Sequence, residues 1–287
     1  MLAWAHARQR SGELMLRLED LDATRCRPEL ALGVLSDLEW LGLDWDGPVL
    51  LQSERLEALR GAAEHLLQTG SAYPCVCTRA DLKSAATAPQ RGVEELRYPG
   101  TCRGRFLPVA LGKQPCALRL AVPDGAISLV DGIAGHQLFD VAAEVGDFVI
   151  SNRARLPSYQ LAVVVDDAAQ GVNEVFRGDD LLPSTPRQML LQRALGLPEP
   201  AWFHVPLVLD AEGRRLAKRA DDLSLTTLRQ SGVDPRAIIQ WVADSAGFDA
   251  PERLTCRELC KSFEIGRMSR QPVVLTEQVI GGLARAR

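Results

Sequence analysis

Three cysteines and a tyrosine form the first group of residues that could do chemistry. Cys75 and Cys77 stand one residue apart, and Tyr98 and Cys102 follow in the pattern YxxxC. Thiolates are soft ligands for a tetrahedral Zn²⁺, and a phenolate oxygen or a water could supply the fourth ligand. The alternative is a set of reduced, unrelated cysteines beside an ordinary aromatic residue. Because the cysteines cluster in a turn-rich segment with little core of its own, the pattern favours zinc.

A cluster of carboxylates ends the strand-like segment LRLEDLD, Leu16 to Asp22. At the edge of a sheet, Glu19 could hold a substrate ammonium group through charge-assisted hydrogen bonds. Spacing alone favours the alternative, in which Asp20 and Asp22 cap the following turn and Glu19 is solvated.

Tyr159 and Arg177 form a third candidate group, in the segments SYQLAVVVDD and VFRGDD. Both side chains could face one pocket, where Arg177 would grip a carboxylate in a bidentate manner and Tyr159 would shape the wall. A surface Arg177 paired with Asp179 or Asp180 is an equally good interpretation of the spacing.

The basic loop RRLAKR, residues 214–219, follows an apolar run. Its Lys218 could meet triphosphate oxygens and stabilise the charge that develops during phosphoryl or nucleotidyl transfer. Basic loops are usually only solvated, so the spacing alone favours that alternative.

Apolar periodicity predicts the helices that would position these groups. One is expected at 28–41, and a second is expected to follow Ser53 as its N-cap and to stop at Gly70. A third is expected at 186–195, and the chain from about residue 223 has a mainly helical pattern, which indicates a small C-terminal unit.

Continuous apolar runs predict strands. LAVVV at 161–165 and HVPLVLD at 204–210 have the β-branched character of parallel strands that are buried on both faces. Between residues 117 and 150, the runs ALRLAV, ISLV and DFVI, separated by turn sequences, predict short strands. Strands that alternate with helices indicate an α/β fold with a parallel sheet, whose ligands bind beyond the carboxyl ends of the strands.

The composition is that of a globular protein, with 46% hydrophobic and 24% charged residues, which argues against a disordered or fibrous chain. No stretch approaches the ~20 apolar residues of a membrane span, and MLAWAHARQR lacks the apolar run of a signal peptide, so we expect a cytoplasmic protein. Seven cysteines, an odd number, suit reduced thiols or a metal better than a disulfide framework. A net charge of -4 gives no general attraction to nucleic acid, so any RNA contact would need local basic patches.

Taken in order, five sequence blocks resemble those of the glutamyl-queuosine tRNA(Asp) synthetases, small relatives of glutamyl-tRNA synthetase. They are LRLEDLD, CxC with YxxxC, SYQLAVVVDD, VFRGDDLLPSTPRQMLLQRALGLP and HVPLVLDAEGRRLAKR. VVVDD followed by RGDDLLPSTPRQ is too long and specific to be chance. The resemblance implies the Rossmann-type α/β catalytic core of a class I aminoacyl-tRNA synthetase, without an anticodon-binding domain. It implies four parts: the two halves of the core at 1–70 and 141–210, a zinc-binding insertion with connective strands at 71–140, and a KMSKS-like loop with a helical stem-contact unit at 211–287.

The resemblance also implies a function, in which glutamate is activated by ATP to glutamyl-adenylate and transferred to queuosine at the wobble position of tRNA(Asp). The positions that match the family's functional residues are Glu19, Tyr159 and Arg177 for glutamate, Lys218 for ATP and catalysis, and Cys75, Cys77, Tyr98 and Cys102 for zinc. The implied ligands and partners are therefore L-glutamate, ATP with Mg²⁺, one Zn²⁺ per chain, and tRNA(Asp) that contains queuosine. We expect a monomer and no membrane partner.

Two departures from the family pattern affect this expectation. Family members begin with an RFAPSPTG-type strand and a HIGH-like segment, whereas this chain begins with MLAWAHAR, which resembles the end of the helix that follows. In the KMSKS-like loop, Arg215 stands for the first lysine and Ala217 for the usual serine. We therefore expect the natural protein to extend upstream and the 287 residues alone to form adenylate weakly or not at all. The alternatives are a catalytically impaired zinc- and RNA-binding protein, or a glutamate ligase with another acceptor.

Overall fold

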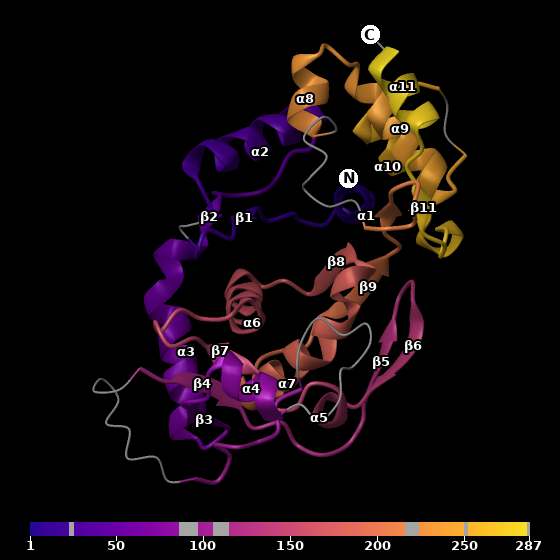
Figure 1. Ribbon diagram of the computed structural model, residues 1–287. Helices are drawn as coiled ribbons and strands as arrows, with labels where there is room; N and C mark the ends of the chain where they lie inside the picture. Colours follow the sequence, from indigo (N-terminus) through magenta and orange to yellow (C-terminus); the bar gives the residue numbers. More distant parts are fainter. Residues whose placement is uncertain (23–25, 86–96, 106–114, 216–223, 250–251, 286–287) are drawn as a thin grey trace.

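A computed structural model describes residues 1–22, 26–85, 97–105, 115–215, 224–249 and 252–285 (Figure 1). The helices are α1 (Leu2–Gln9), α2 (Pro28–Trp40), α3 (Leu56–Gln68), α4 (Arg79–Ala85), α5 (Val141–Glu144), α6 (Tyr159–Gln170), α7 (Thr185–Leu195), α8 (Leu225–Gln230), α9 (Pro235–Ala246), α10 (Cys256–Ser262) and α11 (Glu277–Arg285), with the short 3₁₀ helices η1 (Gln52–Arg55), η2 (Asp179–Ser184) and η4 (Ile265–Arg267). The strands are β1 (Arg17–Leu18), β2 (Leu50–Leu51), β3 (Ala72–Cys75), β4 (Ala117–Leu120), β5 (Ile127–Asp131), β6 (Gly135–Phe139), β7 (Val149–Ser151), β8 (Glu174–Gly178), β9 (Ala201–Val205), β10 (Val208–Leu209) and β11 (Val273–Val274).

Parallel strand pairs form the framework of the candidate site. β1 pairs with β2, and β8 pairs with β9, in both cases in parallel. A third parallel pair, β10–β11, joins the segment after β9 to the C-terminal part of the chain. Within the described ranges no strand joins the β1–β2 pair to the β8–β9 pair, and residues of both β1 and β8 line one cavity.

The remaining strands are antiparallel and lie on one side of these pairs. β4 is the centre of the sheet β3–β4–β7, and β5 and β6 form a hairpin that projects beside β9 (Figure 1). The short strands expected between residues 117 and 150 are therefore confirmed.

Two hydrophobic cores hold these parts together. The first lies among α3, α6, α7 and the sheet β3–β4–β7, with Leu66, Ile150, Leu161 and Leu191 fully buried in it. The second lies among α1, α9 and α10, where α1 packs against α10; close by, α2 packs against α8. The helices expected at 28–41, at 186–195 and in the C-terminal segment are present.

The prediction of a buried strand at 161–165 is wrong, because these residues form the middle of α6. Four consecutive side chains, Leu161 to Val164, are buried there, since α3, α7 and β7 all pack against this helix. A helix that is enclosed on several sides has an unbroken apolar run, which sequence periodicity cannot distinguish from a buried strand. The helix ends at Gly171, which adopts the left-handed conformation at φ 71°.

Two smaller predictions also need correction. Ser53 is not the N-cap of α3; it lies in η1, and its backbone N–H and its Oγ both donate to the carboxylate of Asp20, each at 2.7 Å. HVPLVLD is not one strand, because Pro206 lacks the N–H that a ladder requires and separates β9 from β10, which belong to different sheets. No helix in the described part of the chain is long and apolar enough to cross a membrane.

Candidate active site

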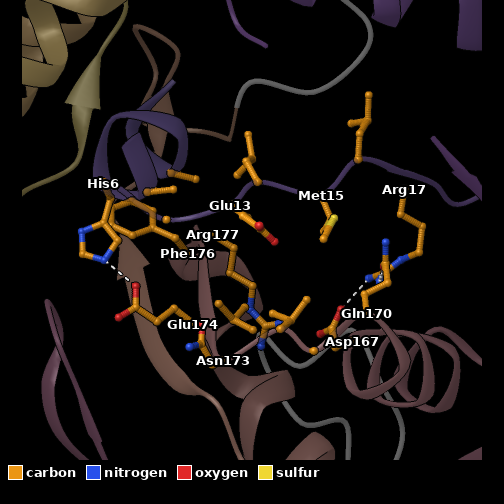
Figure 2. Close-up of a pocket in the computed structure, with 18 of the residues that line it drawn as sticks. His6, Glu13, Met15, Arg17, Asp167, Gln170, Asn173, Glu174, Phe176 and Arg177 are labelled. Carbon is orange, nitrogen blue, oxygen red and sulfur yellow. Dashed lines mark hydrogen bonds and ion pairs between the residues drawn. The ribbon is translucent and has the colours of Figure 1, made fainter. Parts of the chain in front are cut away.

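A cavity of about 880 Å³ lies between β1 and β8 (Figure 2). Its walls are α1, the segment 11–19, one face of α6 from Tyr159 to Gln170, and β8. Glu19, Tyr159 and Arg177, which come from three separate segments of the sequence, all line it. Lys218, the fourth candidate, lies outside the described residues.

Acidic side chains line the wall formed by β1 and α6. Arg17 Nη2 lies 2.8 Å from Asp167 Oδ1 and 3.5 Å from Glu19 Oε1. Burial raises the pKa of both Glu19 and Asp167, and the attraction of Arg17 only partly opposes it. This wall therefore carries one more negative than positive charge when both carboxylates are ionised.

Arg177 supplies the opposite charge from β8, and Figure 2 shows its side chain in the centre of the cavity wall. Burial lowers the pKa of Arg177, against the attraction of Tyr159, Asp167 and Asp180. An arginine remains charged even so, and its guanidinium carbon lies 5.0 Å from the centre of the Trp202 ring. A half-buried cation of this kind has a strong tendency to bind a carboxylate.

The interpretation of Arg177 as a surface residue paired with Asp179 or Asp180 does not describe the structure. Asp180 Oδ2 lies instead 2.8 Å from Arg215 Nη1. Tyr159, the first residue of α6, is 41% exposed, and burial of the rest of its side chain raises the pKa of its hydroxyl.

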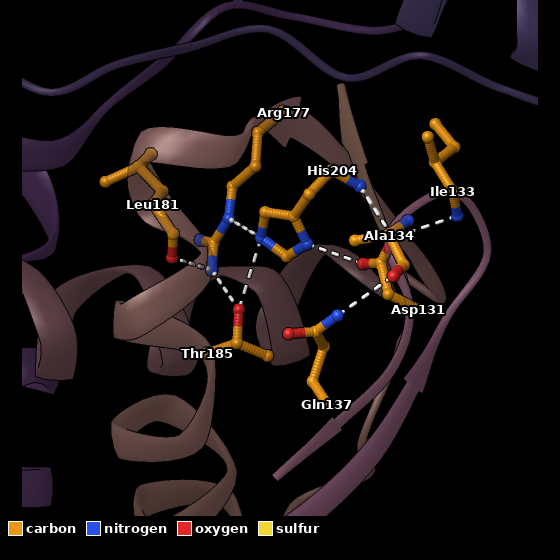
Figure 3. Close-up of polar contacts among 8 residues, drawn as sticks. All are labelled: Asp131, Ile133, Ala134, Gln137, Arg177, Leu181, Thr185 and His204. Atoms are coloured by element: carbon orange, nitrogen blue, oxygen red, sulfur yellow. Dashed lines mark hydrogen bonds and ion pairs between the residues drawn. The ribbon is translucent and has the colours of Figure 1, made fainter. Parts of the chain in front are cut away.

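Sequence reasoning did not identify the groups that hold Arg177 (Figure 3). Its Nε donates to His204 Nε2 at 3.1 Å, and its Nη2 donates to Thr185 Oγ1 at 2.9 Å and to the carbonyl oxygen of Leu181 at 3.3 Å. His204 Nδ1 in turn lies 2.6 Å from Asp131 Oδ2, and both side chains are fully buried. A histidine inside the apolar run HVPLVL was the one signal that could have indicated this network.

The other end of the cavity holds a second histidine pair. His6 Nε2 lies 2.8 Å from Glu174 Oε2, and Arg10 Nη1 lies 3.3 Å from Glu174 Oε1. The His6 ring packs against Phe176 and Phe203, with centroid distances of 5.3 and 5.0 Å. This end of the cavity therefore carries aromatic rings, and Glu174 is paired with both His6 and Arg10.

The expected metal ligands come together at the end of β3. The Sγ atoms of Cys75, Cys77 and Cys102 all lie within 4.8 Å of one another, and the Cys77 and Cys102 sulfurs are 3.5 Å apart. Tyr98 Oη is 3.4 Å from Cys75 Sγ and 3.8 Å from Cys77 Sγ. Zn–S bonds of about 2.3 Å in a tetrahedron place sulfurs about 3.8 Å apart, so the donor set fits Zn²⁺.

Arg119 supports this cluster. Its guanidinium carbon lies 3.8 Å from the centre of the Tyr98 ring, and its Nε donates to Cys75 Sγ at 3.3 Å. A buried cation beside the sulfurs stabilises thiolates, the form that binds metal. Its Nη1 donates to the carbonyl oxygen of Asp147 at 2.7 Å, which fixes the guanidinium.

The fold and the cavity define a class I aminoacyl-tRNA synthetase catalytic domain. The family model described as "tRNA synthetases class I (E and Q), catalytic domain" matches residues 1–280, and the chain belongs to this family. Within it, the chain belongs with the glutamyl-Q tRNA(Asp) synthetases. It is 46% identical to that protein of Symbiobacterium thermophilum, over 99% of this chain and 92% of the relative, and 44% identical to that of Nocardia farcinica, over 96% and 87%.

Solved structures agree with this assignment. The glutamate-tRNA synthetase of Elizabethkingia anophelis superposes with a TM-score of 0.82 at 26% identity, over 98% of this chain and 65% of that protein. A glutamate tRNA ligase of Elizabethkingia meningosepticum, solved in complex with its amino acid, gives 0.82 at 27% identity, over 98% and 64%. The chain thus spans just under two thirds of these larger synthetases.

Proposed function

We propose that this protein activates L-glutamate with ATP and transfers the glutamyl group to queuosine at the wobble position of tRNA(Asp). The observation that carries the proposal is that Glu19, Tyr159 and Arg177 line one cavity. The names of the relatives, glutamyl-Q tRNA(Asp) synthetases, support the choice of acceptor.

The charges around the cavity match those of glutamate. The carboxylate of Glu19 would hold the ammonium group, and the guanidinium of Arg177 would hold a carboxylate. Because the α-carboxylate must remain free to react, Arg177 is assigned to the side-chain carboxylate, with Tyr159 as the adjacent wall. A cation at this position favours glutamate over glutamine, whose amide carries no charge.

Activation then needs positioning rather than a protein nucleophile. An α-carboxylate oxygen of glutamate attacks the α-phosphorus of ATP, the bond to the β-phosphate oxygen breaks, and pyrophosphate leaves. Lys218 is proposed to stabilise the charge on the phosphates. Bound Mg²⁺ would neutralise phosphate charge in the same step.

Transfer follows without a further cofactor. A hydroxyl on the cyclopentene ring of queuosine attacks the activated carbonyl carbon, its proton is released, and AMP leaves. The cluster of Cys75, Cys77, Cys102 and Tyr98 would hold Zn²⁺ as a structural ion. It belongs to a different part of the molecule from the cavity, so no step of the reaction is assigned to it.

Substitution of Arg177 by lysine tests the amino acid site. Lysine keeps the charge but loses the planar fork that matches a carboxylate, so we expect the KM for glutamate in ATP–pyrophosphate exchange by the full-length natural protein to rise at least about tenfold. Binding of labelled glutamate in equilibrium dialysis should weaken in parallel, and the KM for ATP should stay unchanged. Arg236→Lys, in an exposed pair with Asp234, is the matched control and should leave both values unchanged.

Labelled glutamate with tRNA(Asp) of both kinds tests the acceptor. We expect transfer to tRNA(Asp) that contains queuosine and none to tRNA(Asp) with unmodified guanosine at that position. Equal transfer to both would show that the acceptor is wrong, and exchange that does not depend on glutamate would reject the amino acid.

A further inference from the structure

The hydrogen bonds around Arg177 fix the protonation of a histidine that does not reach the cavity. Arg177 and His204 are direct partners in the parallel register of β8 and β9. A guanidinium can only donate, so His204 Nε2, which faces Arg177 Nε at 3.1 Å, must be an acceptor. A carboxylate can only accept, so His204 Nδ1, at 2.6 Å from Asp131 Oδ2, must carry the proton. His204 is therefore neutral, with its hydrogen on Nδ1.

Asp131 is held so that it enforces this tautomer. Its Oδ1 accepts backbone N–H groups of Ile133, Ala134 and His204, at 2.9, 2.8 and 3.1 Å, which leaves Oδ2 for the imidazole (Figure 3). Burial alone would raise the pKa of Asp131, but the hydrogen bonds from His204 and the backbone outweigh it and lower the pKa. Asp131 is therefore a carboxylate, and it is fully buried with His204.

The network leaves a defined part of the guanidinium for a ligand. A guanidinium has five N–H groups, and His204, Thr185 and Leu181 account for three of them, on Nε and Nη2. The two hydrogens of Nη1 remain for a ligand and for the hydroxyl of Tyr159, which lines the cavity and also interacts with the guanidinium. On the side away from the cavity, His204 and Thr185, which do not line the cavity, hold Arg177 together with the carbonyl oxygen of Leu181.

We propose that Asp131 and His204 are positioning residues that set the orientation of Arg177 for the carboxylate of the amino acid substrate. This inference rests on the proposed function of Arg177. A carboxylate that orients an imidazole, which then orients a cation, keeps a buried charge in one geometry before the substrate arrives. No chemistry is assigned to Asp131 or His204.

The variant Asp131→Asn separates this role from simple packing. The three backbone N–H groups would keep the asparagine carbonyl at the Oδ1 position, so its NH₂ group would face His204 Nδ1. Nδ1 would then have to accept, and the proton would move to Nε2, which could then donate to the Thr185 hydroxyl 3.2 Å away but could no longer accept from Arg177. We expect glutamate binding by equilibrium dialysis to weaken at least about tenfold, with ATP binding unchanged.

Nitrogen-15 NMR of the imidazole measures the tautomer directly, whatever the activity. The chain has four histidines, so a His204 variant assigns the signals of this ring. We expect the wild-type protein to carry the His204 proton on Nδ1 and Asp131→Asn to carry it on Nε2. A wild-type ring protonated on Nε2, or on both nitrogens at neutral pH, would overturn the inference.

Two substitutions of His204 provide the rescue test. Glutamine retains an acceptor near the position of Nε2, whereas asparagine retains a group only near Nδ1 and leaves Arg177 without its partner. We expect glutamate binding within about threefold of wild type for His204→Gln and at least about tenfold weaker for His204→Asn, with similar thermal stability. Equal binding by these two variants would reject the positioning role. Unchanged binding by Arg177→Lys would instead reject the proposed function.

Discussion

Arg17 on β1 and Asp167 on α6 form an ion pair, with 2.8 Å between Nη2 and Oδ1, in the wall of the cavity that Arg177 enters from β8. This pair joins β1 to α6 within one wall of the cavity, and β1 and β8 belong to different sheets. Arg17 also faces Glu19, so one cation is shared between two carboxylates. The ammonium group of an amino acid would supply the missing positive charge.

At Glu19, the negative charge that would favour glutamate binding lowers the stability of the folded protein. Burial raises its pKa even with Arg17 alongside, so folding disfavours its charged form. The folded protein is therefore most stable, with respect to this group, at a pH below the pKa that Glu19 has in the unfolded chain. That stability is lost as the pH rises through the pKa that Glu19 has in the folded protein. We therefore expect Glu19→Gln to unfold at a slightly higher temperature than wild type at pH 7, while its glutamate affinity falls.

The size and pH dependence of this effect are both measurable. The gain should be well under about 1 kcal/mol, because the Glu19 side chain is 41% exposed and water screens it. Thermal unfolding from pH 4 to pH 8 should show the advantage of the variant growing as the pH rises and then levelling off. An advantage that is largest at pH 4 would contradict the raised pKa.

Local sequence signals were sufficient for a helix whose start and end are both marked by characteristic residues. The helix at 185–195 has Pro186 near its start and Gly196 in the left-handed conformation at its end, which makes its limits readable. The helix at 159–170 also ends at a left-handed glycine, Gly171, but its unbroken apolar run at 161–165 is equally typical of a buried strand.

In the candidate site, too, some residues could be predicted from the sequence and others could not. Family resemblance was enough to select Glu19, Tyr159 and Arg177, and the structure brings them to one cavity. The partners of Arg177 could not be found in this way, since Asp131 and His204 become neighbours only when the β5–β6 hairpin packs against β9. Contacts between distant segments depend on the whole fold and leave little trace in a local motif.

The cysteine cluster allows a direct test of metal binding. Cys102→Ser removes one of the three expected thiolate ligands. Substitution of a residue that only supports a metal ligand typically lowers metal affinity roughly tenfold to hundredfold, so we expect the loss of a ligand to lower zinc affinity by more than that. Elemental analysis after dialysis should give about one zinc per chain for wild type and much less for the variant. Cys116→Ser is the control, because Cys116 is outside the ligand group, and it should retain the metal. Wild-type protein without zinc would remove the metal site.

Gly146 links the cluster to the end of α5. It has φ of 71°, and a Cβ atom added there would lie 2.5 Å from the carbonyl oxygen of Tyr98. We expect Gly146→Ala to lower the free energy of unfolding by about 1 to 3 kcal/mol and to reduce zinc retention, because Tyr98 must move. Gly171→Ala, at the same φ with no atom near its Cβ, isolates the backbone strain alone. If both variants retain zinc equally, the contact with Tyr98 does not support the cluster.

Substitution of Lys218 should affect the rate of glutamate activation far more than the affinity for glutamate. Arg215, the last described residue before Lys218, pairs with Asp180 at 2.8 Å, and Asp180 lies in η2 next to Leu181, whose carbonyl oxygen accepts from Arg177. A cation on this loop would act on phosphate charge that grows during activation, and it would contribute little to glutamate itself. In the full-length natural protein we therefore expect Lys218→Ala to slow ATP–pyrophosphate exchange roughly a hundredfold while glutamate binding in equilibrium dialysis stays within about twofold. Lys261→Ala, an exposed lysine at the end of α10, should change neither quantity. A Lys218→Ala protein that loses glutamate binding and exchange to the same extent would place this lysine in the amino acid site instead of beside the nucleotide.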